Sequence, residues 1–449
     1  MALFWHFLFS AVCSSDKKVI LWMYHTQSGM DSKRTIPFLL PVMPSGFFRI
    51  SGWIIIIPIV GERKVEQKMN EPKVFMDCYH GVFRDQDAFL SCLRRIGENS
   101  SWRRQKAKNL RLIPLAQGSE LAEKMKVKYT DSGLDEDIIT DTILNTGLLL
   151  KDRNEYYPIR SCAIKSILDR AGIQGNGLRR VEKNVYARIL NDCLKVAQGE
   201  ALIRFSVGKV SAVLSGDCND YSILDMEELF HHAVEYLTDN FKGCQYLGGF
   251  YEHNMVSALW ELTGEDELLK AYRDEIRMHG KSIGDMKPVV RITTSDTGSG
   301  GANIFPMLLS SKGSLTINLG SPLRLEHRHG NDIQEFDKQL NQLYGKFQQA
   351  TGKLVNLLQI DIVHPIGCMK NVMDKLKIPK KYQAEALELF QAQYDLDFCT
   401  AHDIYYGISE ILYMLACDGE EGSRIAHMEE NIARALAFNW AEYDIPETF

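Results

Sequence analysis

The segment VVRITTSDTGSGGANIFPMLL, residues 289–309, decides the fold class of this protein. Residues Val289 to Thr294 have the β-branched, apolar composition of a strand, and Asn303 to Leu309 form a second run of the same kind. Between them, Asp296-Thr297-Gly298-Ser299-Gly300-Gly301 is a glycine-rich loop that turns the chain back. The segment therefore predicts two strands joined by a turn.

Strands and helices alternate irregularly before this segment. Residues 201–206 alternate between apolar and polar, and Gly208-Lys209 makes the turn to a second strand at 210–214, which predicts a hairpin. Periodic or strand-like runs predict helices at 163–172, 181–197, 225–240 and 265–278, and strands at 244–251 and 255–262. Because regular strand-helix-strand repeats are absent, we expect an α+β fold with a mixed or antiparallel sheet, rather than a doubly wound sheet.

Only helical patterns follow Gly330. Apolar residues at helical spacing over 336–358 predict one long helix, and Pro379 precedes a second. Thr400 is a suitable N-cap for a third helix at 401–417, and Ser423 for the last. We therefore expect four regions: an apolar N-terminal extension at 1–68, an arm with a basic island at 69–150, an α+β core at 151–330 and an α-helical C-terminal domain at 331–449.

The first 68 residues differ in composition from the rest. Their apolar runs lack amphipathic periodicity, and the run Trp53 to Val60 is too short to cross a bilayer and is interrupted by Pro58. Codons for Gly61 to Lys68 can be almost pure purine, like a ribosome-binding sequence just before Met69. We expect translation to start at Met69, so that residues 1–68 are non-coding sequence read as protein, or are poorly ordered. The alternative is a genuine anchor that holds the protein at a membrane.

The composition is that of an ordinary soluble protein, with 45% hydrophobic and 24% charged residues. It excludes a mainly disordered chain, a collagen-like repeat and a polytopic membrane protein. The net charge is -6, and residues 1–68 carry 8 Lys/Arg against 4 Asp/Glu, so the remainder is at -10. A histone-like polycation is thus excluded, although local basic patches are not. None of the 10 cysteines has C-x-x-C spacing, which favours reduced cysteines and a cytoplasmic location.

No catalytic residue, metal ligand or cofactor site is assigned from the sequence. Asp296-Thr297-Gly298-Ser299 is similar to the loop of aspartic proteases, in which two carboxylates share a proton, but the chain has no second Asp-Thr-Gly. A glycine-rich turn is the preferred interpretation, and a hydrolase using Asp296 stays an alternative. The loop matches neither glycine motif of nucleotide-binding proteins. His327 and His329 would share one face of an extended segment, but no third ligand is visible.

Two groups of basic residues indicate contact with nucleic acid. The first, called the basic island here, has no acidic residue between Ser100 and Leu115. The second lies in or beside apolar strands, where alternation predicts a wet, basic sheet face. Lysines and arginines attract phosphates, and an aromatic ring can stack on an unpaired base. The plainer alternatives are a solvated flexible arm and an ordinary polar sheet face. The island consists of Trp102, Arg103, Arg104, Lys106, Lys108 and Arg111, and the sheet face of Arg204, Lys209 and Arg291.

An ordered set of short segments covers most of the chain from about Tyr157 to Glu447. These segments are Ala171-Gly172-Ile173, Asn191-Asp192, Val213-Leu214-Ser215 with Asp217 and Tyr221, Ser295-Asp296-Thr297-Gly298, Asp403-Ile404-Tyr405 and Asn439-Trp440. In this order the chain resembles the phage and plasmid-like protein family known as domain of unknown function 932. The resemblance implies a protein carried by phages, plasmids and integrated elements, without an established enzymatic activity. The long apolar N-terminus departs from it.

Taken with the basic residues, this context predicts a non-enzymatic, nucleic-acid-associated protein of mobile elements that binds single strands. One alternative is a host-interaction or anti-defence protein that binds a host protein through the helical tail after Gly330. The other is the hydrolase using Asp296. No membrane partner is expected unless residues 1–68 are genuine.

Overall fold

The computed structural model describes five strands within the first 72 residues, and residues 73–446 except 176, 218–220, 266, 282–285, 311–315, 329, 395 and 421. The chain divides into two compact units, Met1–Met69 and Asn70–Phe449. This boundary coincides with the change of composition at Met69. The first unit contains an antiparallel sheet of β1 (Phe7–Cys13), β2 (Lys18–His25) and β3 (Pro37–Pro41), and a pair of β4 (Phe47–Ile50) with β5 (Trp53–Ile56).

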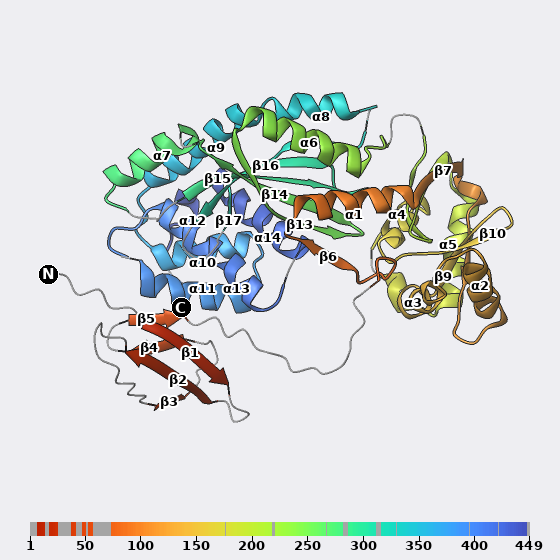
Figure 1. Cartoon of the computed structure of the whole chain (residues 1–449), viewed down its shortest axis with the longest axis horizontal. Coiled ribbons are helices and arrows are strands. Elements are labelled where there is room, and N and C mark those ends of the chain that lie inside the picture. Colours follow the sequence, from red (N-terminus) through yellow and green to blue (C-terminus); the bar gives the residue numbers. More distant parts are fainter. Residues whose placement is uncertain are drawn as a thin grey trace. The chain divides into compact units, whose positions relative to one another are not determined.

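The second unit is built on a seven-stranded antiparallel sheet (Figure 1). The predicted segment 289–309 provides its β15 (Met286–Thr294) and β16 (Ala302–Ser310), with Ile292 opposite Ile304. The predicted pair of strands and the α+β class are therefore confirmed. The strand order is β17 (Thr316–Asn318), β16, β15, β14 (Met255–Thr263), β13 (Gly243–Glu252) and β6 (His80–Phe83), and β18 (Leu323–Leu325) also pairs with β16.

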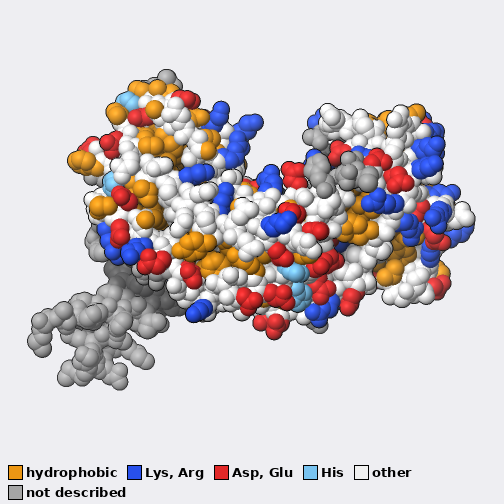
Figure 2. Space-filling view, turned by 90° about the horizontal axis from the view of Figure 1, so that it is seen from above, with side chains coloured by type: hydrophobic (Ala, Val, Ile, Leu, Met, Phe, Trp, Pro, Cys, Tyr) orange, Lys and Arg blue, Asp and Glu red, His pale blue; other side chains and the backbone are white. Residues whose placement is uncertain are grey.

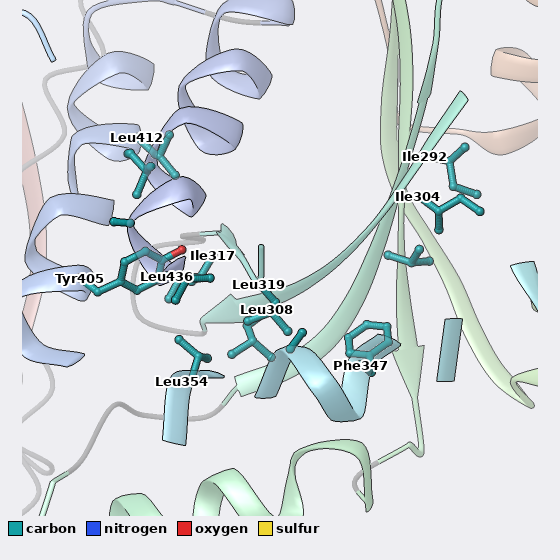
Figure 3. Close-up of a cluster of buried hydrophobic side chains, with 14 of the residues drawn as sticks. Ile292, Ile304, Leu308, Ile317, Leu319, Phe347, Leu354, Tyr405, Leu412 and Leu436 are labelled. Carbon is teal, nitrogen blue, oxygen red and sulfur yellow. The ribbon is translucent and has the colours of Figure 1, made fainter. Parts of the chain in front are cut away.

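The main hydrophobic core lies between this sheet and the helices that pack on it. Figure 3 shows part of the core, where Ile292, Ile304 and Leu308 of the sheet lie near Phe347 and Leu354. Figure 1 shows α6 to α9 along one side of the sheet and α10 to α14 gathered near its β17 end. There α12 packs on α7 and α9, with Tyr272 Oη 2.6 Å from Nε2 of His402, and α14 packs on β17. The helices are α1 (Gln86–Glu98), α6 (Met226–Asn240), α7 (Glu267–Met278), α8 (Ile333–Leu340), α9 (Leu343–Leu358), α10 (Pro365–Lys375), α11 (Lys380–Gln393), α12 (Ala401–Ser409), α13 (Ile411–Cys417) and α14 (Ser423–Ala433).

Residues 100–217 form a small lobe that is inserted into the second unit between α1 and α6; the rest of the described chain from residue 73 is called the large lobe. The described part of the small lobe holds two antiparallel sheets and four α-helices around two cores (Figure 1), one of which also contains Phe75 from the segment before β6. The predicted hairpin at 201–214 is confirmed as β11 and β12. The sheets are β12 (Lys209–Ser215), β11 (Glu200–Ser206) and β7 (Ser100–Lys106), and β10 (Glu155–Pro158), β9 (Leu148–Asp152) and β8 (Arg111–Pro114); the helices are α2 (Glu120–Asp131), α3 (Asp137–Asn145), α4 (Ala163–Arg170) and α5 (Lys183–Val196).

The boundaries expected near residues 150 and 330 do not separate independent cores. Residues 69–150, expected as an arm, are divided between the lobes, because β6 pairs with β13 in the large sheet whereas β7 and β8 pair with strands of the small lobe. The helices after Gly330 share the main core with the sheet. Residues 70–449 therefore form one compact unit.

The helical region differs from the expectation at two breaks. The single helix predicted over 336–358 is α8 and α9, because Leu340 and Leu343 keep helical spacing across the break and so conceal it. The helix predicted at 401–417 is likewise α12 and α13. Thr400 forms the predicted cap, a capping box, but the N-cap of α14 is Gly422 rather than Ser423. Among the described helices, none has the length and apolar character needed to cross a bilayer.

Candidate functional site

The three basic residues expected on a wet sheet face are buried. Arg204 is 3% exposed, Lys209 is 0% exposed, and the side chain of Arg291 is 13% exposed. Val289, on the same face of β15 as Arg291, is buried as well, and α14 supplies Glu429 as the partner of Arg291. The prediction of a solvated basic sheet face is therefore wrong, because other parts of the chain cover these strands.

Arg204 and Lys209 connect the two lobes through buried ion pairs. Arg204 pairs with Asp296, which lies in the turn between β15 and β16 of the large lobe. The Lys209 ammonium lies 2.8 Å from Oδ1 of Asp77, in the large lobe, and also contacts Asp141 of the small lobe. A buried charge needs such a partner, since desolvation of an isolated ion is costly. These cations stabilise the contact between the lobes and are not free to bind phosphate.

The first half of the basic island is a paired strand rather than a flexible arm. Residues 100–106 form β7, which is hydrogen-bonded to β11. The half-buried Trp102 ring lies 5.7 Å from the Tyr221 ring and 5.8 Å from the Arg204 guanidinium, measured to ring centroids. Arg103 forms an ion pair with the buried Asp152. Trp102 and Arg103 therefore have partners within the protein.

The second half of the island is open to solvent. Lys106 and Lys108 are exposed and form no ion pair within the described part of the chain. Arg111 donates to the carbonyl oxygen of Lys108 at 2.8 Å, and Arg104 to that of Gly216 at 2.7 Å. Neither arginine forms an ion pair with a described residue. Four cations of the predicted site thus form no ion pair with a described carboxylate.

This surface continues onto α5. Asn191 exchanges hydrogen bonds of 2.7 and 2.8 Å with the backbone of Leu112, and the Ala107 N–H donates to the carbonyl oxygen of Gly199 at 3.1 Å. Exposed Arg188 lies one turn before Asn191 on the same helix. It therefore adds to the side of the small lobe that carries the island.

The sequence prediction missed a second basic stretch, residues 165–188. This stretch contains six Lys/Arg and two Asp/Glu. Lys165, Arg170, Arg180 and Arg188 form no ion pair with any described residue, and Lys183 donates to the carbonyl oxygen of Thr146 at 2.5 Å. A charge count by segment would have found the stretch, whereas its assignment to α4, α5 and the loop between them needed the structure.

Charge is unequally divided between the lobes. Residues 100–217 hold 20 Lys/Arg and 14 Asp/Glu, a net charge of +6, whereas residues 218–449 hold 20 Lys/Arg and 35 Asp/Glu, a net charge of -15. Figure 2 shows Lys and Arg side chains gathered at the right-hand end of the molecule, which is the small lobe. The overall negative charge of the protein therefore conceals a basic lobe.

A cavity of 1150 Å³ lies where the lobes meet. One wall is α4 with the loop that follows it. The opposite wall combines the turn between β13 and β14 with the glycine-rich turn after β15. The residues that line it include Ile164, Lys165, Leu168, Asp169, Ile173, Gln174, Leu214, Asn254 and Ser299.

The titratable groups at this cavity are held by neighbouring protein groups. Burial raises the pKa of the Cys162 thiol to about 11, and its Sγ–H donates to the carbonyl oxygen of Ser211 at 3.2 Å. The thiol is therefore protonated at neutral pH and is a poor nucleophile. Nδ1 of His80 lies 2.9 Å from Oε1 of Glu252, which also accepts the Ser423 N–H at 3.2 Å at the start of α14.

The Asp296 loop is a hairpin turn, as its glycines indicate. Gly298 has φ +72°, and a Cβ there would lie 2.8 Å from Leu214 Cδ2, so the position favours glycine. Burial raises the pKa of the Asp296 carboxyl group, and the Arg204 guanidinium acts in the opposite direction. The carboxylate is thus paired with a cation, whereas a protease of the type considered needs a second carboxylate that shares its proton. The pairing of Asp296 with Arg204 does not favour a hydrolase that uses Asp296.

His327 is a buried structural residue. Its Nδ1 lies 3.1 Å from the carbonyl oxygen of Ser222, its ring stacks on that of Tyr221 with centroids 5.2 Å apart, and burial lowers its pKa. His329, considered with it, lies outside the described residues. No group of three His, Cys, Asp or Glu side chains that could hold a metal ion occurs among the residues that the structure describes.

Comparison with known proteins gave no match to a family model, to a curated protein or to a solved structure.

Proposed function

We propose that this protein binds single-stranded nucleic acid through the small lobe, without catalysing a reaction, in the cytoplasm of cells that carry phage- or plasmid-type mobile elements. The observation that carries the proposal is the division of charge, with +6 on residues 100–217 and -15 on residues 218–449. A polyanion is attracted by the first lobe and repelled by the second. The cytoplasmic location rests on the cysteines, which are free wherever they are described.

The proposed binding surface consists of exposed or half-exposed cations that form no ion pair with a described residue, although Glu200 lies opposite Lys106 and Asp192 one turn after Arg188. We take five of these cations as the phosphate contacts: Lys106, Lys108, Arg111, Arg180 and Arg188. If each neutralises one phosphate, the logarithm of the binding constant should fall with that of salt with a slope of about -3.5. Affinity should then drop about 100-fold between 50 and 200 mM salt. Trp102 and Arg103 stay outside this surface because they pack within the lobe.

Fluorescence anisotropy of a labelled oligothymidylate over a range of salt concentrations tests the proposal. The variant Lys106→Glu/Lys108→Glu should bind at least about tenfold more weakly, and its salt slope should flatten to about -2. The matched control is Lys242→Glu/Lys375→Glu, which changes the net charge equally at exposed positions of the large lobe. It should bind almost as the unaltered protein does. Binding without salt dependence, or equal losses in both variants, would overturn the proposal.

A protein partner of the helical region is a second candidate. It is favoured by two side chains exposed on that region, Phe398 at 81% and Val363 at 75%. Under this alternative, the protein is an anti-defence or other host-directed protein. The variant Phe398→Ser should then no longer capture a host protein, whereas the variant Lys106→Glu/Lys108→Glu should still capture it. The reverse pattern would favour nucleic acid.

A further inference from the structure

The cavity between the lobes borders the basic stretch directly. Lys165 lines the cavity, and the chain runs from there through α4 and the loop at 171–182 to α5. The loop has positive φ at Gly172 (67°) and Gly175 (87°), which allows it to fold tightly at the cavity wall. The basic stretch therefore begins at the cavity wall, and Arg180 and Arg188 follow it on the loop and on α5.

The charges of the cavity do not favour a phosphate inside it. Asp77 and Arg160 belong to the buried ion pairs between the lobes, and Glu252 accepts hydrogen bonds from its neighbours. Lys165 and Asp169 remain, one turn apart on α4 and of opposite sign. Their charges cancel, so the lining favours a ligand group without net charge.

The remaining lining residues suit a flat group with polar edges. Ile164, Leu168 and Leu214 give the cavity apolar walls. Gln174 and Asn254 also line it, and neither amide side chain is hydrogen-bonded to a described residue. An amide offers both a donor and an acceptor, which is what the edge of a nucleobase requires. The volume of 1150 Å³ leaves room for one base.

We propose that this cavity takes up one unstacked base of a single strand whose backbone lies on the basic surface of the small lobe. The inference rests on the proposed function and adds where the base goes. Phosphates stay outside, on the cations Lys106, Lys108, Arg111, Arg180 and Arg188, while the base enters between the apolar walls. Amide edges can adapt to more than one base, so binding should be tolerant of sequence.

An oligothymidylate in which every second base is 2-aminopurine tests this inference, because the fluorescence of that base rises when it leaves the stack for an aliphatic pocket. Binding to the full-length protein should raise the fluorescence. In the variant Gln174→Ala/Asn254→Ala, the fluorescence increase on binding should be smaller by at least about half, whereas the affinity measured by anisotropy should change less than about threefold. The control Gln348→Ala/Gln349→Ala removes two exposed amides of α9 and should behave as the unaltered protein.

The outcomes separate this inference from the proposed function. Anisotropy that reports binding without a fluorescence change, or a full rise in Gln174→Ala/Asn254→Ala, overturns the base pocket and leaves strand binding intact. Absence of any anisotropy change overturns both. Photo-crosslinking with 4-thiothymidine gives a readout that needs no variant. It should label the tryptic peptides 166–170 or 171–179, and labels confined to other peptides contradict the pocket.

Discussion

Replacing Asp296 by alanine removes one half of a buried ion pair that joins the two lobes. Arg204 is 3% exposed, and the Asp296 side chain is 11% exposed. The guanidinium would keep the Ser211 hydroxyl at 3.1 Å and the Trp102 ring at 5.8 Å, but neither carries a compensating charge. The variant therefore leaves a buried cation without an anion.

The expected cost is about 3 kcal/mol of the free energy of unfolding. Removing one partner of a buried ion pair typically costs about 3–5 kcal/mol, and the remaining contacts of Arg204 place this case at the low end. Replacing both residues, as in Arg204→Met/Asp296→Leu, should cost much less, because no unpaired charge stays behind. The double variant should thus be more stable than Asp296→Ala alone.

Urea unfolding followed by circular dichroism measures both free energies. Asp274→Ala is the control, because Asp274 is exposed and pairs with Arg277 at 3.6 Å on the surface of α7; it should shift the midpoint little. The reasoning fails if Asp296→Ala costs less than about 1 kcal/mol, or if the double variant is the least stable of the three.

Three further outcomes are expected. Burial lowers the pKa of His327 below 6.5 and that of His402 from 6.5 to about 3. Below pH 6.5 the unfolded chain therefore binds more protons at these histidines than the folded protein does, so the free energy of unfolding should fall with pH, by up to about 1.4 kcal/mol per pH unit for each histidine. Equal urea midpoints at pH 7 and 5.5 would contradict this. Gly422→Ala should lower the melting temperature, since φ is 60° and a Cβ would collide with Oε1 of Glu252; unchanged melting would refute the clash. Cys162, with a thiol pKa of about 11, should resist thiol reagents at pH 8 until the protein is unfolded, as peptide mass spectrometry can show.

The hairpins could be predicted from sequence because their signals are local. The turn glycines and the alternation in 201–214 lie within a few residues of the strands that they define. The α+β class followed from these local elements. Helix breaks could not be seen, because Leu340 and Leu343 satisfy the periodicity of a continuous helix.

The candidate site was harder to predict because charge pairing is not local. Lys209 and Asp77 are 132 residues apart, so alternation along the strand could not reveal that the lysine is neutralised. Arg291 was expected in solvent for the same reason, since Glu429 reaches it from α14. Lys106 and Lys108 have no acidic neighbour in the sequence from Ser100 to Leu115 and form no ion pair with a described residue, although Glu200 of β11 lies opposite Lys106.

The insertion of the small lobe also sets an order of events during synthesis. Val82 of β6 pairs with Phe250 of β13, so the ribosome must add about 170 residues between them, which takes about 10–30 s. Until then the apolar side of α1, with Phe89 and Leu93, has no sheet or α6 to cover it. The small lobe, made in that interval, has cores of its own and can fold first. Nascent chains of this protein therefore offer chaperones a hydrophobic helix during that interval.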